Sequence, residues 1–331
     1  MSNKVKYNLK NVHAAKLTES VVDGVTSFSY DTPKAIPGAV SISLDAEGDS
    51  SPFYADGIVY FRTSSNNGYS GDLEMALIPE WFRTEILREK LDNKGVLVEK
   101  AFGANAAQTR EMLAVAKETG MLCAEAIWTR YMPSRAIIDK ILASGAIGEI
   151  QAIDANLCYP TTAKARITDP ALAGGALLDV GVYPINFIDM IMHNAPIARI
   201  ESSMRAYETG VDAHNSMTFY YENGVMATAQ SSILCHSDRT GSVWGTDGYM
   251  VCQNINNVEA IDVYDGNHTV VAHYDVPAQL TGYEYEVAAA AQAVIDGRTE
   301  CEEMPHADTL RIMELMDSLR RDWNLTYPFE R

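Results

Sequence analysis

Hydrophobic and polar residues alternate along the first quarter of the chain. In the stretch 4–10, Val5, Tyr7 and Leu9 alternate with lysine and asparagine, and the stretches 40–48 and 71–79 repeat the pattern. Asp-Gly, Pro-Gly, Glu-Gly and Asn-Gly pairs lie between the alternating stretches. A period of two interrupted by turn signals predicts antiparallel strands that bury one face.

The pattern of hydrophobic and polar residues changes near residue 95. The stretch 79–91 predicts a helix that Pro79 opens and that ends before Gly95. Residues 96–98 then form a continuous apolar run, which is typical of a strand covered on both faces.

The next fifty residues predict a β-α-β-α order. Asn105 is a suitable N-cap for a helix that ends at Gly120, and the apolar run 121–127 predicts a second strand. Pro133 opens a second helix, which ends near Gly145. This order is the pattern of a parallel sheet.

Beyond residue 149 strands dominate. Four strands are expected in the stretches "EIQAIDANLC", "ARIESSMRAY", "NSMTFYYEN" and "GVMATAQSSIL", followed by two hairpins that turn at 246–248 and 265–267. Helices are expected from about Asp179, over 283–296 and over 306–321. The chain is therefore expected to have an α+β and α/β fold, in which a C-terminal open and mostly antiparallel sheet carries helices on one face.

Composition narrows the function classes. The chain has 331 residues and a net charge of -18, which argues against nucleic-acid binding because a nucleic-acid site needs a basic surface. Five scattered cysteines without a C-x-x-C pair favour free thiols in the cytoplasm over disulfides or zinc. No stretch of about 18 apolar residues is found for a membrane span. The seven histidines form no H-x-x-x-H or H-E-x-x-H pair, so no metal is expected.

Motifs along the last two-thirds of the chain share one family likeness. The stretches "VLVEKAFGANAAQTREMLAVAKETG", "EAIWTRYMPSRAIIDKILASGAIGEI", "DPALAGGALLDVGVYPINF" and "MPHADTLRIMELMDSLRRDWNLTYPFE" follow one another in this order. With them, residues 96–331 resemble the Gfo/Idh/MocA oxidoreductases, in particular the trans-dihydrodiol dehydrogenase-like branch. The resemblance implies NAD(P) as cofactor, a Rossmann domain followed by an α/β substrate domain, and a small diol or sugar-like substrate. It also implies a homo-oligomer, a dimer packed through the open sheet.

Residues 1–98 resemble a different family. The stretch "SISLDAEGDSSPFYADGIVYFRTSSNNGYSGDLEMALIPEWFRTEIL" is similar to the amino-terminal part of a tailed-phage major tail (tube) protein, a β-rich structural protein. The two resemblances meet on residues 96–99, for which a recombination or assembly junction is the simplest account. The chain is thus expected to comprise a β-rich segment 1–95, a Rossmann remnant 96–148 and a substrate or oligomerisation domain 149–331.

Hydride transfer from a secondary alcohol needs a base at the hydroxyl and a cation for the developing alkoxide. By the resemblance, Lys100 of the motif Glu99-Lys100-Ala101 lies at the carboxyl end of a parallel strand near the nicotinamide, and Glu99 and Lys100 contact the cofactor. Partial burial would lower the pKa of Lys100 and suit it to both tasks. The alternative is a solvated lysine at a strand end.

The stretch "GGALLDVGVYP" supplies partners for that amine. Asp179 and Tyr183 are four residues apart and would share one face of a helix, where the carboxylate orients an amine and the phenol donates a proton to substrate. The alternatives are a helix N-cap and a packing aromatic. Gly174 and Gly175 would let the backbone approach substrate closely, or would serve as a loop hinge.

Two further candidates come from the stretch "EAIWTRY". By the resemblance, Trp128 lies beside the nicotinamide and the substrate, although a core tryptophan is the alternative. Arg130 would face a phosphate or carboxylate of the cofactor, or would pair with an internal acid such as Glu125.

The element that a dinucleotide requires is missing from the sequence. A G-x-G-x-x-G loop between a strand and a helix holds the pyrophosphate in dinucleotide-binding folds. The nearest cluster, Gly68-Tyr69-Ser70-Gly71, lacks that spacing. We therefore expect doubtful NAD(P) binding and negligible dehydrogenase turnover. The alternative function is a phage tail structural protein with a foreign C-terminus.

Overall fold

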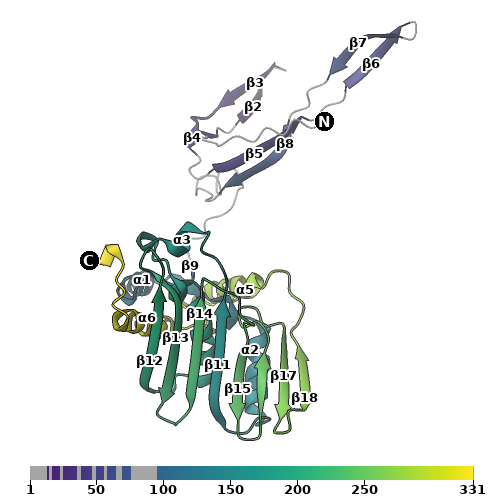
Figure 1. Cartoon of the computed structure of the whole chain (residues 1–331). Helices are drawn as coiled ribbons and strands as arrows, with labels where there is room; N and C mark the ends of the chain where they lie inside the picture. The colour runs from purple at the N-terminus through teal and green to yellow at the C-terminus, as the bar shows by residue number, and fades with distance from the viewer. Residues whose placement is uncertain are drawn as a thin grey trace. The chain divides into compact units, whose positions relative to one another are not determined.

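The structure is a computed structural model that describes residues 13–14, 17–22, 25–35, 39–46, 50–55, 58–64, 69–75 and 95–330. The chain divides into two compact units, Met1–Asp92 and Asn93–Arg331 (Figure 1). The division of the second unit at residue 148 stays a prediction.

The described part of the first unit is made of antiparallel strand pairs. The pairs are β1 (His13–Ala14) with β4 (Lys34–Ala35), β2 (Leu17–Val22) with β3 (Val25–Tyr30), β5 (Ala39–Ala46) with β8 (Tyr69–Met75), and β6 (Ser50–Ala55) with β7 (Ile58–Ser64). Strands β5 and β8 confirm strands over residues 40–46 and 71–75 of the two expected stretches. The strand expected at 4–10 and the helix expected at 79–91 lie outside the described residues.

An eight-stranded sheet dominates the second unit. In spatial order its strands are β12 (Ile197–Ala206), β13 (Asp212–Tyr221), β14 (Met226–Ser232), β11 (Ile150–Cys158), β15 (Gly241–Gly245), β16 (Gly248–Cys252), β17 (Ala260–Asp265) and β18 (Val270–Asp275). Only β11 and β14 run parallel, and every other neighbouring pair in this sheet is antiparallel. The expected open and mostly antiparallel sheet, with both hairpins, is confirmed.

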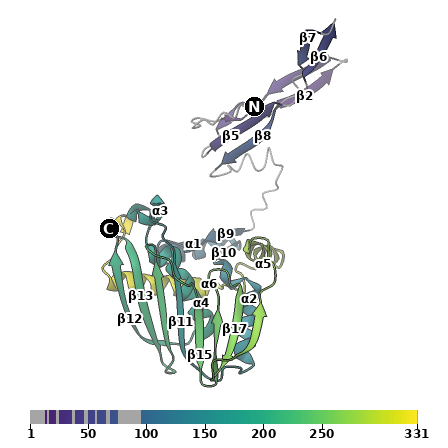
Figure 2. The same ribbon diagram turned by 45° about the vertical axis from the view of Figure 1, so that its right-hand side comes forward.

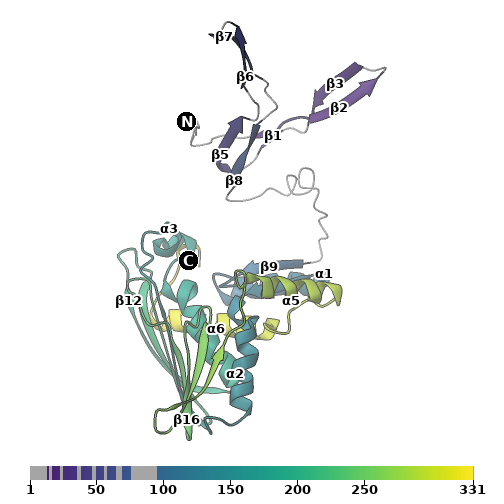
Figure 3. The same ribbon diagram turned by 90° about the vertical axis from the view of Figure 1, so that its right-hand side faces the viewer.

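One face of this sheet forms the core. In β13 the side chains of Met217, Phe219 and Tyr221 are buried, whereas Thr218 and Tyr220 between them are half-buried, as a strand with one better covered face requires. Helix α4 (Val182–Met192) packs across β11 and β14. Figure 3 views the unit from the side and shows α2, α5 and α6 on the same side of the sheet.

The other helical elements that complete this unit include two long helices and several short turns. They are α3 (Ala165–Thr168), α5 (Tyr283–Ile295), α6 (His306–Asp322), the 3₁₀ turns Trp128–Arg130, Pro170–Leu172 and Pro328–Glu330, and a π-helical turn over Leu177–Gly181. The helices expected over 283–296 and 306–321 are thereby confirmed. The helix expected from about Asp179 begins with the π-helical turn and continues as α4.

A second, smaller sheet carries the start of this unit. Strand β9 (Gly95–Glu99) pairs in parallel with β10 (Leu122–Ala126), and α1 (Ala106–Thr119) connects them. Asn105 caps α1 through its side chain, and Gly120 ends it in a left-handed conformation, as expected. Helix α2 (Pro133–Ala143) follows β10. Figure 2 shows β9 and β10 between α1 and α5. The β-α-β-α order is confirmed, and its origin as a Rossmann remnant stays a prediction.

One segment of the described residues is long and apolar enough to cross a membrane by length and composition alone. It runs from Pro170 to Met192, with a mean hydropathy of 1.4 over its most apolar window. The expectation that no such stretch exists is therefore wrong on this criterion. Since 72% of that window is buried inside the fold, the segment has the burial of a core helix.

Candidate functional site

The end of strand β9 presents Lys100 to the π-helical turn Leu177–Gly181 that precedes α4. The Lys100 ammonium donates a hydrogen bond of 2.5 Å to the main-chain carbonyl of Asp179, and its Nζ lies 3.7 Å from the Asp179 Oδ1. The same nitrogen lies 4.9 Å from the centre of the Tyr183 ring. The structure thus brings the three predicted catalytic residues together, with the amine between the acid and the phenol.

The local sequence explains why the Asp179 carbonyl is available. Asp179 lies in the π-helical turn Leu177–Gly181, where a carbonyl accepts from the residue five positions later. For Asp179 that residue is Pro184, which has no N–H. The spacing of Asp179 and Tyr183 had suggested that they share one face of a regular helix. The π-helical turn changes this geometry, so they do not. They meet instead around Lys100.

Burial lowers the pKa of the Lys100 amine. The Lys100 side chain is only 11% exposed, and this loss of solvent lowers its pKa, although the nearby carboxylates of Asp179 and Glu99 act in the opposite direction. Burial likewise raises the pKa of Glu99, and the Lys100 charge counteracts that rise. The expected depression of the Lys100 pKa agrees with this environment.

Tyr183 is held as a neutral phenol. Burial raises its pKa, and the charge of Glu99 and the neighbouring Tyr283 and Asp179 raise it further. A phenol with a raised pKa keeps its proton at neutral pH, so it can donate a hydrogen bond or a proton to an oxygen that gains negative charge.

A pocket of about 210 Å³ opens beside these groups. Lys100, Arg166, Gly174 and Asp179 line it together with apolar residues. The Arg166 guanidinium donates a 2.7 Å hydrogen bond to Asp179 Oδ1, so that two cations share one carboxylate. Sequence reasoning missed Arg166, because α3 has only four residues and a single arginine in it carries no periodic signal.

Packing within the fold explains why Gly174 and Gly175 are glycines. A Cβ on Gly175, whose φ is +130°, would lie 2.1 Å from Asp212 Oδ1. A Cβ on Gly174 would lie 2.6 Å from the Ile167 carbonyl oxygen. Both positions therefore need glycine for packing within the fold, and Gly174 also borders the pocket. Contact of either glycine with substrate stays a prediction.

Trp128 lies next to Tyr183. Its ring stacks on Tyr283 with 4.6 Å between the ring centres and 23° between the planes, and its Nε1 lies 3.4 Å from Asn256 Oδ1. A hydrogen bond from Trp128 also acts to lower the Tyr183 pKa. The half-buried indole thus belongs to the group of residues around Lys100.

Glu286 of α5 is a second residue that sequence reasoning missed. The side chain is buried, and its Oε2 has no hydrogen-bond partner among the described residues. Burial and the neighbouring Glu99 raise its pKa to about 7. Sequence alone places Glu286 in a helix rich in alanine without showing that it faces Glu99.

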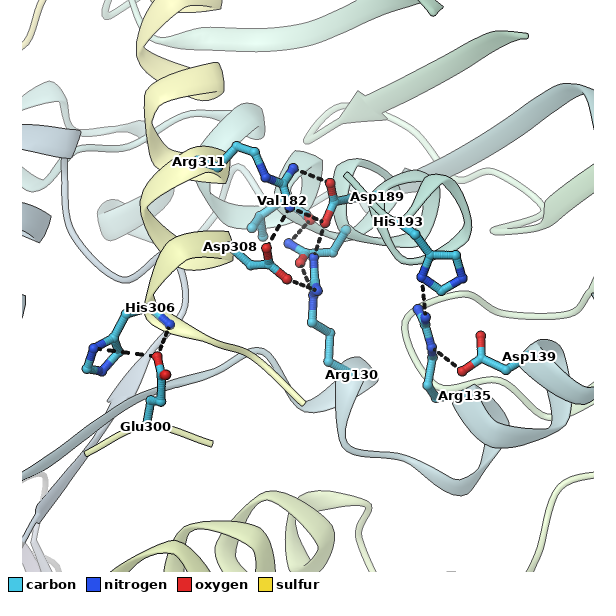
Figure 4. A network of polar contacts seen from close by, with 11 residues as sticks. Arg130, Arg135, Asp139, Val182, Asp189, His193, Glu300, His306, Asp308 and Arg311 are labelled. Carbon is cyan, nitrogen blue, oxygen red and sulfur yellow. Dashed lines mark hydrogen bonds and ion pairs between the residues drawn. The ribbon is translucent and has the colours of Figure 1, made fainter. Parts of the chain in front are cut away.

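Arg130 lies in a different, buried ion network (Figure 4). Its Nε donates a 2.6 Å hydrogen bond to Asn186, and its terminal nitrogens lie 2.5 Å from an oxygen of Asp189 and 3.4 Å from one of Asp308. Arg311 also binds Asp189 and Asp308. Arg130 is therefore not brought to the pocket at Lys100, and its acids are these two aspartates rather than the expected Glu125. Its contact with a cofactor stays a prediction.

Asp189 depends on these arginines. Burial opposes its ionisation, but the hydrogen bond from Arg311 and the charge of Arg130 outweigh it and hold the pKa of Asp189 below its ordinary value. The network therefore keeps a buried carboxylate charged and ties α4 to α6.

The described residues do not fit the pyrophosphate of a dinucleotide. The loop between β9 and α1 is the described strand-to-helix loop that begins at Lys100, and two of the first three amides of α1 are already occupied. The Ala106 amide donates a 2.8 Å hydrogen bond to Asp317, and the Gln108 amide donates one of 2.9 Å to the Asn105 side chain. A carboxylate at this helix start would also repel a phosphate.

Within residues 95–330 and the described strands before them, no three His, Cys, Asp or Glu side chains gather as a metal site would require. The expectation of no metal stays a prediction.

Comparison with known proteins places this fold in a family. Residues 136–251 match the GFO/IDH/MocA C-terminal domain. The trans-1,2-dihydrobenzene-1,2-diol dehydrogenase of Macaca fuscata fuscata is 31% identical over 243 residues, which cover 72% of this chain and 73% of that protein. The chain belongs to the GFO/IDH/MocA oxidoreductase family, and the relatives it matches include dihydrodiol dehydrogenases.

Solved structures agree with this assignment. A 3-ketoreductase from Actinomadura kijaniata, in complex with NADP and TDP-benzene, is 25% identical with a TM-score of 0.61, covering 69% of this chain and 70% of that one. An aldose-aldose oxidoreductase from Caulobacter crescentus, complexed with glycerol, shares the fold with a TM-score of 0.62 at 18% identity, covering 69% of each chain. The resemblance of residues 1–98 to a tail tube protein stays a prediction.

The depressed pKa of Lys100 predicts a specific pH dependence of stability. Because the unfolded chain binds the Lys100 proton more tightly than the folded chain does, the free energy of unfolding should rise as pH increases from the folded pKa towards the ordinary value of 10.5. The variant Lys100→Met should lack this contribution. Urea unfolding between neutral pH and pH ~10 measures the difference, and parallel curves for the two proteins would contradict the assignment.

The ion network predicts unequal costs for two arginines. Arg130→Met leaves Asp189 buried with one partner fewer and should lower the free energy of unfolding by about 3–5 kcal/mol. Arg135→Met is the matched control, since its half-exposed pair with Asp139 is worth below ~1 kcal/mol. In an Asp189→Asn background the cost of Arg130→Met should shrink. Equal costs for Arg130 and Arg135 in urea unfolding would refute the buried network.

Proposed function

We propose that residues 95–330 carry the substrate and proton-transfer half of an NAD(P)-type oxidoreductase acting on a CH–OH or carbonyl group of a small diol or sugar-like polyol. The observation that carries this proposal is the meeting of Asp179 and Tyr183 around the Lys100 ammonium, beside a pocket that Lys100 and Asp179 line. The oxidoreductase relatives support the reaction class.

The roles of the three side chains follow from their charge states. Tyr183 is a neutral phenol at neutral pH and exchanges a proton with the substrate oxygen. The Lys100 cation stabilises negative charge on that oxygen, and its lowered pKa eases the return of a proton. Asp179 holds the ammonium in place through its main-chain carbonyl and balances its charge through the carboxylate.

The proposed substrate class rests on the pocket and on the names of the relatives. The pocket is small, and it presents the cations Lys100 and Arg166 against the single carboxylate Asp179. Such a lining suits a compact molecule with several hydroxyl groups. Relatives named for a dihydrodiol and an aldose support the same class.

We further propose that the chain turns over little as it stands, because its described residues offer no site for the cofactor phosphates. The occupied start of α1 supports this view. The absence of a G-x-G-x-x-G loop from the sequence supports it as well. The hydride transfer that NAD(P) supplies in such enzymes is therefore not assigned to these residues.

Titration with NADPH tests this proposal directly. The full chain should show no saturable change in NADPH fluorescence up to ~1 mM, because the contacts to the pyrophosphate are missing. The 3-ketoreductase from Actinomadura kijaniata, which is solved in complex with NADP, serves as the positive control under the same conditions. Micromolar binding by this chain would contradict the proposal.

The open face of the large sheet is proposed as a dimer contact. Trp244 of β15 and Met226 of β14 are each 43% exposed, and their neighbours Val243 and Ala227 on these strands are buried.

The five cysteines are unpaired, which supports a reducing compartment such as the cytosol.

Light scattering after size exclusion measures the proposed dimer. The full chain should elute as a dimer, and Trp244→Asp should shift it towards monomer because a charge on an apolar contact is costly. Ala107→Asp, at an exposed position on α1 rather than on the sheet, is the control. A monomeric unmodified chain would contradict the proposal.

A further inference from the structure

Two cysteines that are far apart in the sequence meet where the chain crosses the end of strand β11. Strands β14 and β15 lie on either side of β11, the first parallel and the second antiparallel to it. Residues 233–240 connect β14 to β15, so they pass over the carboxyl end of β11, where Cys158 is the last residue. Cys235 lies in this crossing segment.

Hydrogen bonds fix the crossing segment to β11 on both sides of Cys235. Before it, the Ile233 carbonyl accepts a 3.0 Å hydrogen bond from the Thr161 amide. After it, the Ser237 hydroxyl oxygen accepts one of 3.2 Å from the Cys158 amide. Cys235 is therefore held beside the end of β11.

The burial of Cys158 shows that the crossing segment covers this residue. Successive residues of a strand point to opposite faces, and Leu157 belongs to the core face of the sheet. Cys158 lies on the open face with Asn156, which is half-buried, yet Cys158 is only 3% exposed. The crossing segment provides this cover, since the Asn156 side chain also accepts a 3.1 Å hydrogen bond from the Arg239 amide.

The two thiols are close enough to interact. Burial, together with the charge and the hydrogen bonding of the Cys235 side chain, raises the pKa of Cys158 to about 11, although a hydrogen bond with Ser237 acts in the opposite direction. Of the five cysteines, all of which the structure describes, Cys235 alone is exposed. A reagent in solution therefore reaches Cys235 first and finds Cys158 next to it.

We propose that Cys158 and Cys235 form a site of reversible oxidation, at which a small-molecule disulfide converts the two thiols into an intramolecular disulfide. The inference goes beyond the proposed function, since neither thiol lines the pocket at Lys100.

The site is also separate from the proposed dimer contact. Met226 and Trp244 both pair with Ala152, near the start of β11. At about 3.3 Å per residue, this position is roughly 20 Å along the strand from Cys158. A dimer formed through Met226 and Trp244 can therefore leave Cys235 open to solvent.

The reaction exchanges one disulfide for another. The Cys235 thiolate attacks one sulfur of the reagent RS–SR, forms a mixed disulfide and releases RS⁻, which takes up the proton that Cys235 has lost. Cys158 then loses its proton and attacks the Cys235 sulfur, so that the second RS⁻ leaves and is protonated. The protein thiols lose two electrons, and the reagent gains them as two molecules of RSH. The second step is the slower one, because the raised pKa keeps Cys158 protonated.

Reaction of the folded full chain with an equimolar amount of dithiobis(nitrobenzoate), a disulfide whose thiolate product is coloured, tests the proposal. Each chain should release two coloured thiolates, one in a fast phase and one in a slow phase. The product should carry no label and should weigh less than the reduced chain by two hydrogen atoms. The tryptic peptides 141–164 and 206–239, which contain one cysteine each, should be linked.

The slow phase should depend on pH in a specific way. Its nucleophile, Cys158, has a pKa of about 11, so the fraction of thiolate grows as pH increases towards that value. Between about pH 7 and pH 9 the slow phase should become about tenfold faster with each pH unit.

Three variants assign the phases to residues. Cys158→Ser should release one coloured thiolate and retain the label on Cys235. Cys235→Ser should lose the fast phase, because the remaining thiols are buried. Cys123→Ser removes a buried cysteine outside the pair and is the matched control, which should keep both phases. Circular dichroism shows whether each variant is folded.

Three results would overturn the proposal. One is a folded unmodified chain that keeps a stable label on Cys235 and releases no second thiolate. Another is a disulfide that joins two chains, seen as a dimer on a non-reducing gel. The third is a tryptic link from Cys235 to a cysteine other than Cys158. All three are measured on the unmodified chain, so they decide the proposal even if a variant fails to fold.

Discussion

The contact between the Lys100 ammonium and the Asp179 carbonyl is the constraint on which the candidate site depends. It joins the end of a small parallel sheet to the first turn of the helix that crosses the large sheet. A hydrogen bond to a main-chain oxygen fixes the amine without supplying a full negative charge. Burial can therefore lower the Lys100 pKa while the Asp179 carboxylate, at 3.7 Å, limits the effect.

The arginine network holds the scaffold behind this contact. Arg130 and Arg311 bind Asp189, so the helix that begins at the π-helical turn is tied near its other end to α6. The network is separate from the pocket, and its charges balance within the protein. Two polar clusters contact this helix at different places: one ties it to α6, and the other, around Lys100, is the site that we propose for proton transfer.

Much of this arrangement could be predicted from the sequence, and physical reasons explain why the rest could not. Alternation and turn signals predicted the strands of the large sheet, and Asn105 and Gly120 predicted both ends of α1, because these signals are local. The spacing of Asp179 and Tyr183 suggested one helical face, but Pro184 and the π-helical turn changed the geometry. Arg130 forms ion pairs with Asp189 and Asp308, which lie far along the chain from it. The local sequence pattern could therefore not reveal these partners.

The titration of Lys100 tests the central claim most directly. In the full chain labelled with ¹³Cε-lysine, the signal absent from Lys100→Arg reports the charge of this amine as pH is varied. The account predicts a midpoint below the ordinary value of 10.5, and a still lower midpoint in Asp179→Asn, where the opposing carboxylate is removed. A midpoint at or above 10.5 in both proteins would show that the amine is solvated, and the proposed site would lose its basis.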